Sequence, residues 1–208
     1  MIKLEKINKA YKSITLFENL NLEINDGERI AISGVNGSGK SVLLKMICGY
    51  AKPDSGKVVV DGICINEENK FIQNAGISIN AEDCINSMTG MENLLYLSNI
   101  KKIATKENIL EIANKLYLKD LDKKYKNYSL GMKQKMRLIQ ALMEKPKYLI
   151  LDEPFDALDD DSKEALINLL NELKDITLIV VSHDHESLNK VTNIKYKINK
   201  FNLEKINQ

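Results

Sequence analysis

The sequence predicts an α/β fold with a parallel sheet at its core, an N-terminal antiparallel β subdomain and a helical insert. Two apolar, β-branched-rich runs, Tyr148 to Leu151 and Thr177 to Val181, flank a stretch with leucines at helical spacing. That strand–helix–strand order is typical of parallel strands. A third apolar run, Arg29 to Ser33, leads through a glycine-rich loop into another helical pattern. Because parallel strands bring their carboxyl ends to one edge, we expect a common site there.

Short strands are expected at the N-terminal end, where apolar and polar residues alternate. Ile2 to Ile7 and Leu20 to Ile24 show this pattern, and a turn follows the second run. Further on, Val58 to Val60 and Ile63 to Ile65 flank Asp61-Gly62. An Asp-Gly pair between two apolar runs predicts a hairpin with a tight turn. These segments form the predicted antiparallel subdomain.

Helices are expected after the glycine-rich loop and from about residue 81 to residue 145. The first of them shows an apolar face and is expected to end at Gly49. Thr89 and Glu92 have the spacing of a capping box, in which each side chain satisfies a helix-end amide. A second helix of the insert centres on Ile112, and a third begins near Ser129 and stops before Pro146.

Composition favours one domain without a nucleic-acid partner. The chain has 208 residues, 44% of them hydrophobic, which suits a single sizeable core. Lys and Arg total 30 against 29 for Asp and Glu, giving a net charge of +1. Nucleic-acid binders more often carry a strong basic surplus, so we expect the short basic runs to be solvated faces.

Cysteine usage and hydropathy favour a cytoplasmic location. Cys48, Cys64 and Cys84 are odd in number and lack metal-ligand spacing, which indicates reduced thiols. The N-terminal residues lack the apolar centre of a signal peptide. No apolar run approaches the ~20 residues needed to span a bilayer.

The glycine-rich loop matches the P-loop pattern G-x-x-x-x-G-K-[ST], after a strand and before a helix. Glycines let backbone amides approach phosphate oxygens, and the helix N-terminus adds partial positive charge. A lysine can then reach the β- and γ-phosphates, and a serine hydroxyl can ligate Mg²⁺. A chance glycine-rich turn is the alternative, which all four fixed positions argue against. The predicted nucleotide-binding residues of this segment are Gly34, Asn36, Gly37, Ser38, Gly39, Lys40, Ser41 and Val42.

An apolar run, Tyr148 to Leu151, ends in two carboxylates, Asp152 and Glu153. A buried strand can deliver Asp152 to a Mg²⁺ ion, whose charge offsets the cost of desolvating the carboxylate. Glu153 can then orient or deprotonate an attacking water. A strand meeting a solvated turn would look the same, but the pairing with a P-loop favours a catalytic pair. Together the two motifs predict a P-loop NTPase that uses Mg²⁺, and they leave many nucleotide-binding families open.

Three further segments resemble the ABC ATPase family. Tyr128 to Gln134 is similar to its signature loop, Ala157 to Asp159 to its D-loop, and Ser182 to Asp184 to its switch-histidine segment. The resemblance extends from Tyr11 to the closing residues. It implies a soluble subunit that works as a dimer with a second copy or a paralogous ATPase subunit.

The resemblance also implies roles for single residues. Ser129 and Gly131 would contact the γ-phosphate of ATP held by the opposite subunit, and His183 would touch the same phosphate from the P-loop side. Asp159 would communicate across the dimer. Tyr11 matches the aromatic that stacks on adenine, with a half-buried strand residue as the alternative. His185 lacks such support and is expected at the surface.

The chain departs from the family pattern at three positions. Leu130 stands where the signature has its first glycine, and Met132 stands where it has a glutamine. Asn80 occupies the region of the Q-loop glutamine and is one methylene shorter. These changes place the signature geometry and a direct contact of Asn80 with Mg²⁺ or its water in question.

The resemblance predicts an ATP hydrolase that couples hydrolysis to substrate movement by an integral membrane transporter subunit. We expect it to be peripheral on the inner face of the cell membrane. The expected organisation is one domain, 1–208, with an ATP-binding core at 1–79 and 146–208 and a helical subdomain at 80–145. The partner is expected to dock near Asn80 to Asn93, with Ile85, Met88 and Met91 as candidate contacts. The alternatives are a non-transport ABC ATPase and a module that binds ATP without hydrolysing it.

Overall fold

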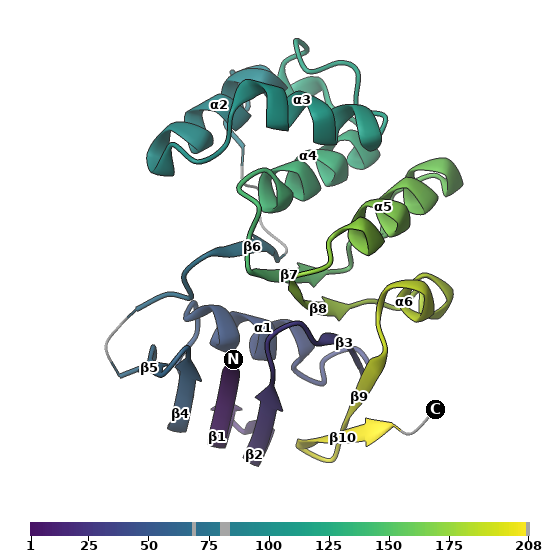
Figure 1. Cartoon of the computed structure of the whole chain (residues 1–208). Helices are drawn as coiled ribbons and strands as arrows, with labels where there is room; N and C mark the ends of the chain where they lie inside the picture. The colour runs from purple at the N-terminus through teal and green to yellow at the C-terminus, as the bar shows by residue number, and fades with distance from the viewer. Residues whose placement is uncertain (68–69, 80–83, 207–208) are drawn as a thin grey trace.

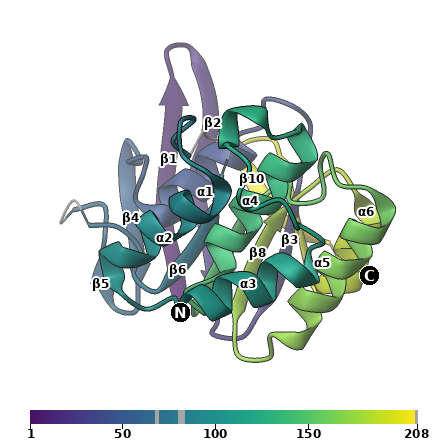
Figure 2. The ribbon, with the colours of Figure 1, turned by 90° about the horizontal axis from the view of Figure 1, so that it is seen from above.

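A computed structural model describes residues 1–67, 70–79 and 84–206. Figure 1 shows an antiparallel sheet at the bottom, a second sheet in the middle and a layer of helices at the top. In the view from above, the helices α2 (Gly90–Lys101), α3 (Lys106–Lys115) and α4 (Leu130–Leu142) lie across the sheets (Figure 2). The layers therefore follow the predicted α/β arrangement with an antiparallel β subdomain and a helical insert.

The antiparallel sheet has the strand order β2-β1-β4-β5. Its strands are β1 (Ile2–Tyr11), β2 (Ile14–Ile24), β4 (Ser55–Val60) and β5 (Ile63–Cys64). The predicted Asp-Gly turn is confirmed, because Asp61 and Gly62 both have positive φ angles, 49° and 82°. The first two strands are longer than the sequence pattern predicted, because their outer halves pair with each other and keep less apolar alternation.

The second sheet has the order β10-β9-β3-β8-β7-β6. Parallel pairing joins β6 to β7, β7 to β8, β8 to β3, and β3 to β9. The C-terminal strand β10 is antiparallel to β9 and was not predicted. The bounds are β3 (Arg29–Ser33), β6 (Ala75–Ser78), β7 (Tyr148–Asp152), β8 (Thr177–Val181), β9 (Ile194–Asn199) and β10 (Asn202–Ile206).

Side-chain alternation along the central strands divides the core into two clusters, one on each face of the sheet. In β7, Leu149 and Leu151 pack with the helical layer, whereas Tyr148 and Ile150 pack with the antiparallel subdomain and the helix α1 (Lys40–Cys48). Strands buried on both faces read as continuous apolar runs, which is what the sequence of β7 and β8 shows. The cluster under the helical layer also includes α5 (Asp160–Glu172), so the insert shares its core with the sheet.

The helix ends follow local sequence signals. The predicted capping box at α2 is confirmed, because Glu92 N donates to Thr89 Oγ1 at 3.1 Å and Thr89 N donates to Glu92 Oε2 at 2.7 Å. Gly49 ends α1 in the left-handed conformation, as expected. A short helix, α6 (His185–Val191), was not predicted; His185 at its start is exposed, as predicted. In the described part of the chain, every helix is too short or too polar to span a bilayer.

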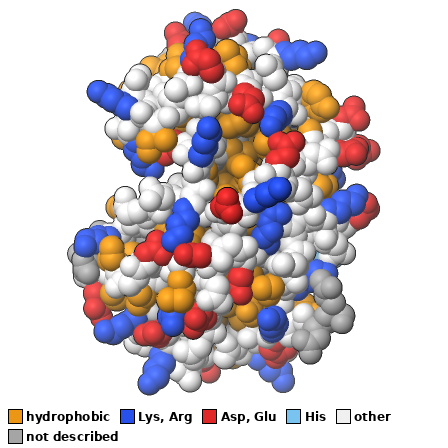
Figure 3. Space-filling view, in the orientation of Figure 1, with side chains coloured by type: hydrophobic (Ala, Val, Ile, Leu, Met, Phe, Trp, Pro, Cys, Tyr) orange, Lys and Arg blue, Asp and Glu red, His pale blue; other side chains and the backbone are white. Residues whose placement is uncertain are grey.

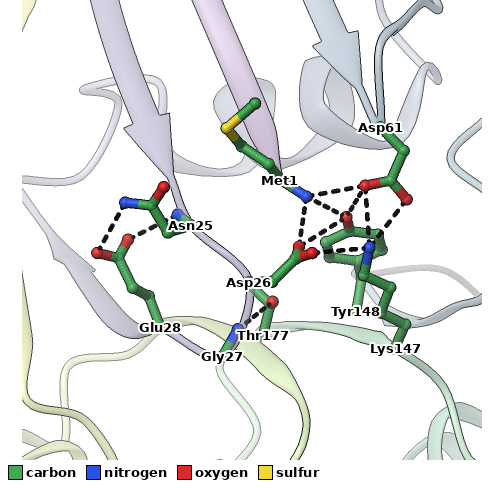
Figure 4. Close-up of polar contacts among 9 residues, drawn as sticks. All are labelled: Met1, Asn25, Asp26, Gly27, Glu28, Asp61, Lys147, Tyr148 and Thr177. Atoms are coloured by element: carbon green, nitrogen blue, oxygen red, sulfur yellow. Dashed lines mark hydrogen bonds and ion pairs between the residues drawn. The ribbon is translucent and has the colours of Figure 1, made fainter.

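A polar network ties the first strand to the central sheet (Figure 4). The amine of Met1 contacts Asp26 in the β2–β3 turn and Asp61 Oδ1 in the β4–β5 turn, the latter at 2.8 Å. It also donates to the hydroxyl of Tyr148 at 2.6 Å. Lys147 Nζ completes the network with bonds of 2.9 and 3.1 Å to the carboxylate of Asp61. Two turns and two strands are thus held together by charge-assisted hydrogen bonds.

The surface shows both charge signs interspersed. On the face of Figure 3, basic and acidic side chains alternate over both the helical layer and the sheets, and apolar side chains are exposed between these two parts. The chain as a whole has 30 basic and 29 acidic residues, so neither sign predominates.

Candidate active site

The glycine-rich loop joins the carboxyl end of β3 to the first turn of α1, so the amides of the helix start face the loop. Gly39 caps α1 with a φ angle of 100°, which side chains rarely adopt. A Cβ there would lie 2.9 Å from Phe17 Cζ, so a side chain at this position would have to displace the ring of Phe17. The sequence folds into this loop because a glycine stands at this crowded, left-handed position.

Two polar groups of the loop, the Lys40 ammonium and the Ser38 hydroxyl, could bind an anion. Lys40 is 9% exposed, and its ammonium donates to the carbonyls of Gly34 at 2.8 Å and Val35 at 3.2 Å. Both partners are neutral, so the buried positive charge is hydrogen-bonded but not neutralised by them. Among the described residues, Ser38 Oγ is buried without a hydrogen-bond partner. Phosphate oxygens would satisfy both groups.

A hydroxyl and a carboxylate meet across the site from different elements. Ser41 Oγ, in the first turn of α1, donates to Asp152 Oδ2 at the end of β7, at 2.7 Å. Asp152 is 5% exposed, because β7 lies between β6 and β8. Hydroxyl and carboxylate oxygens are ligands that Mg²⁺ prefers, and Mg²⁺ is usually bound by one or two carboxylates together with phosphates and waters. The donor set therefore fits this ion.

Glu153 and His183 form the next pair along the site. Glu153 Oε2 accepts a hydrogen bond from His183 N at 3.0 Å, and His183 Nε2 lies 3.4 Å from Oε1. The side chain of Glu153 is 15% exposed, whereas that of His183 is 58% exposed. The parallel register of β7 and β8 brings the two residues together, because Asp152 pairs with Val181. The predicted acid and histidine thus lie at the same edge of the sheet.

These groups surround one open cavity of about 430 Å³. Most of its lining was predicted from sequence, and Leu16 and Asp156 were not. Leu16 comes from the outer half of β2, and Asp156 lies in the loop after Glu153, where no spacing rule marks it. The lining residues are Leu16, Asn36, Gly37, Gly39, Lys40, Ser41, Val42, Asp152, Glu153, Asp156 and His183.

Four predicted site residues lie elsewhere. Ser129 is exposed and caps α4, where its Oγ accepts from Met132 N at 3.2 Å, and Gly131 follows in the first helical turn. Asp159 caps α5, where its Oδ1 accepts from Ser162 N at 2.8 Å. Tyr11 is 50% exposed at the end of β1. Asn80 lies outside the described residues.

The sequence profile described as ABC transporter matches residues 17–156, a span that includes the loop, the signature-like segment and the Asp152–Glu153 pair. This chain belongs to the ABC transporter family. The family resemblance predicted from the motifs is therefore confirmed.

Curated ABC transporter proteins match over most of this chain. An uncharacterized ABC transporter ATP-binding protein of Bacillus subtilis, YybJ, is 31% identical over 98% of this chain and 95% of its own length. The lipoprotein-releasing system ATP-binding protein LolD of Bacteroides thetaiotaomicron is 33% identical, covering 92% of this chain and 94% of LolD. The sulfate/thiosulfate import ATP-binding protein CysA of Synechocystis is 32% identical over 91% of this chain but only 56% of CysA. This chain thus spans little more than half of some relatives.

Solved ABC cassettes share the fold over the whole chain. The dimeric structure of MJ0796, described as a bacterial ABC transporter cassette, has a TM-score of 0.86, 29% identity and full coverage of both chains. A post-hydrolysis dimer of the same cassette bound to ADP and Pi has a TM-score of 0.84 and 27% identity. This ABC family member is an ATP-binding and ATP-hydrolysing transporter subunit. The comparisons support this role over the non-transport alternative.

Proposed function

We propose that the cavity between β2, α1, β7 and β8 binds ATP with Mg²⁺ and hydrolyses it to drive a membrane partner. The observation that carries the proposal is the 2.7 Å contact of Ser41 Oγ with Asp152 Oδ2, set between a buried lysine and the Glu153–His183 pair. Lys40, Asp152 and Glu153 line one cavity together with Ser41, and they would supply the cation, the metal ligands and the base that phosphoryl transfer to water requires.

Lys40, Ser38 and the amides before α1 would hold the phosphates, and Ser41 and Asp152 would hold Mg²⁺. When bound, the ion would neutralise phosphate charge as a Lewis acid. Lys40 would add a fixed positive charge in a largely buried position, where electrostatic interactions are stronger than in water. Stabilising charge that develops during transfer is the main contribution that proteins make to this reaction.

Glu153 would accept a proton from the attacking water. Its carboxylate is mostly buried and fixed by the backbone N–H of His183, which leaves little rotational freedom. His183 is more exposed and would contact the terminal phosphate from the same side. A base that is already held next to the reacting oxygen lowers the entropic cost of bringing the two groups together.

A second copy, or a paralogous subunit, would complete the nucleotide site. Ser129 and Gly131 lie at the exposed start of α4 and outside the cavity of their own chain, so they are free to face a neighbour's nucleotide. Asp159 caps α5 at the end of the loop that carries Glu153. A contact of Asp159 with the second subunit would therefore link that subunit to the loop of the catalytic base. Tyr11 would stack on the adenine ring.

The membrane partner would dock along α2, at the inner face of the cell membrane. A small cavity of about 200 Å³ lies there between α2, α4 and β6. Exposed apolar side chains adjoin it: Tyr96 is 57% exposed and Ile100 71%. In the proposed organisation, 80–145 is a helical subdomain that transmits motion from the ATP-binding core, 1–79 and 146–208, to this surface.

Glu153→Gln tests the catalytic part of the proposal. The substitution keeps the size and removes the base, so turnover should fall by about a hundred-fold or more while ATP binding persists. Steady-state phosphate release and nucleotide binding measure the two effects, and an ATP-bound dimer should accumulate in size-exclusion chromatography.

Glu164→Gln is the matched control, since Glu164 is an exposed acid on α5. Its turnover should equal that of the parent. If Glu153→Gln hydrolyses ATP at the parent rate, Glu153 is not the base. If the unaltered protein binds ATP but does not hydrolyse it, a module that only binds ATP is favoured.

A further inference from the structure

One face of α4 contacts the loop that carries Glu153. Gln134 is 4% exposed, and its Nε2 donates to two successive backbone carbonyls, Glu153 O at 3.1 Å and Pro154 O at 3.0 Å. Buried carbonyls need such donors, because an unsatisfied buried acceptor costs free energy. In the sequence, Gln134 stands out only as the last residue of the signature-like segment.

The backbone that Gln134 holds has an uncommon conformation. Glu153 has a φ angle of 48°, in the left-handed region that a residue with a side chain seldom occupies. This conformation allows Glu153 N to donate to Val181 O at 2.8 Å while the carboxylate accepts from His183 N. A residue kept in such a conformation must be held by its surroundings, and two side-chain hydrogen bonds to its carbonyls contribute directly.

The orientation of the Gln134 amide is itself fixed. Arg137 donates through its NH1 group to Gln134 Oε1 at 3.0 Å. Because the carbonyl oxygen of the amide accepts this bond, the NH₂ group is directed at the loop. The two residues are three positions apart, on neighbouring turns of one helix face.

A second close contact lies one turn earlier on the same face. A Cβ added to Gly131 would lie 2.7 Å from Ala157 O, so α4 and the loop approach closely at this point as well. Ala157 also has a positive φ angle, 58°. The start of α4 therefore lies against both positive-φ residues of the loop, Glu153 and Ala157. We expect a shift of the helix to move the loop as well.

We propose that Gln134 is a positioning residue for Glu153: it holds the carbonyls of Glu153 and Pro154 so that the carboxylate faces the nucleotide cavity. Arg137 acts one step further away by orienting the Gln134 amide. The inference rests on the proposed role of Glu153 as the base. Gln134 would thus position the base from α4, the same helix whose exposed start is proposed to contact the nucleotide bound by the opposite subunit.

Gln134→Leu removes both donors, and Gln134→Glu keeps the size and the Arg137 contact while placing an acceptor against two carbonyls. Both variants should lower kcat by about a hundred-fold, the scale of a misplaced catalytic group, with the KM for ATP within about two-fold of the parent. Gln140→Leu, which alters another glutamine of α4, should retain the parent kcat. If Gln134→Leu folds poorly by circular dichroism, Gln134→Glu decides the question.

A double-mutant cycle separates positioning from general support of the fold. In a Glu153→Gln background, Gln134→Leu should leave the residual single-turnover rate unchanged, because no base remains to be positioned. Independent losses that multiply in the double variant would overturn the proposal, as would an equal rise in KM and fall in kcat. If Glu153→Gln is inactive but the Gln134 variants keep the parent kcat, only the positioning role fails; parent-level activity of Glu153→Gln would instead contradict the proposed function itself.

Discussion

At the scale of single residues, some residues of the site are predicted by local sequence motifs, and others reach it through contacts that no motif predicts. Lys40 and Ser41 follow directly from the P-loop pattern, and the structure places both on the cavity. Asp152 and Glu153 were predicted from an apolar run that ends in two acids, and they lie where the parallel register brings β7 and β8 together. Leu16 reaches the same cavity from a distant strand, so its position depends on tertiary structure alone.

Tyr11 gives a prediction at this scale. Its ring is half exposed, and the ammonium of Lys9 lies over it, 4.8 Å from the ring centroid. Tyr11→Ala should weaken ATP binding by about 1–3 kcal/mol, the size of a base–aromatic stacking contact. Binding of inorganic triphosphate should stay near the parent value, since the phosphate loop is unaltered. Isothermal titration with both ligands measures the difference.

Tyr117→Ala is the matched control, because Tyr117 is similarly exposed, at 56%, and lies after α3. Its affinity for both ligands should equal that of the parent. Equal losses for ATP and triphosphate in Tyr11→Ala would show that Tyr11 supports the fold of the β1–β2 hairpin rather than the adenine ring.

At the scale of elements, signals confined to a few neighbouring residues were predicted well. The capping box of α2 and the Asp61-Gly62 turn need only three or four residues to specify them, and both are confirmed. The hairpin of β9 and β10 was missed, because its burial pattern is mixed and β9 is fixed by pairing with β3, far away in the sequence. The contact of Gln134 with the loop after β7 was missed for the same reason, since it joins two elements.

The network around Asp61 predicts a pH effect on the stability of these elements. Partial burial raises the pKa of Asp61, but hydrogen bonds from the Met1 amine, Tyr148 and Lys147 outweigh it and hold the pKa well below its usual range. A carboxylate with a lowered folded-state pKa adds stability above its unfolded pKa of about 3.9 and loses that contribution as the pH falls. Asp61→Asn should therefore cost about 1 kcal/mol at pH 7, a value discounted for exposure.

The deficit should shrink as the pH falls below about 4, because Asp61 of the unfolded parent then binds a proton while the folded carboxylate, with its lowered pKa, stays ionised. Urea unfolding of both proteins at a series of pH values measures it. Asp122→Asn, which changes an exposed acid near the helical layer, should show no such trend. A constant difference between Asp61→Asn and the parent at all pH values would mean that packing, not the ionised network, is lost.

At the scale of the whole molecule, the two core clusters explain how nucleotide chemistry can move a distant surface. The sheet carries Asp152 and Glu153 at one edge, while its helical face shares a continuous apolar core with α2, α3 and α4. Densely packed interiors transmit displacement rather than absorb it. We therefore expect a shift at the loop after β7 to reach α2 through α4, and α2 presents the exposed residues proposed for the membrane partner.

The residues proposed from sequence as docking contacts differ in their exposure. Of the three residues proposed from sequence, Ile85 is 43% exposed, whereas Met91 is partly buried and packs against the core. The larger exposed side chains lie further along α2, at Tyr96 and Ile100, which are four positions apart and therefore on one face of the helix. Tyr50 adjoins the same cavity, and its ring lies 5.6 Å from that of Phe71.

Ile100→Glu tests this surface as the docking site. A charge at this 71% exposed position should leave the basal ATPase rate of the purified subunit unchanged, because Ile100 lies outside the nucleotide cavity. Docking of an apolar partner segment would bury the new carboxylate without a partner charge, which is strongly unfavourable. Co-purification with the membrane subunit, and its stimulation of ATP hydrolysis, should therefore be lost. Leu110→Glu makes the same change at an exposed position of α3 and should retain both. Normal assembly and transport by Ile100→Glu would place the docking surface elsewhere on the molecule.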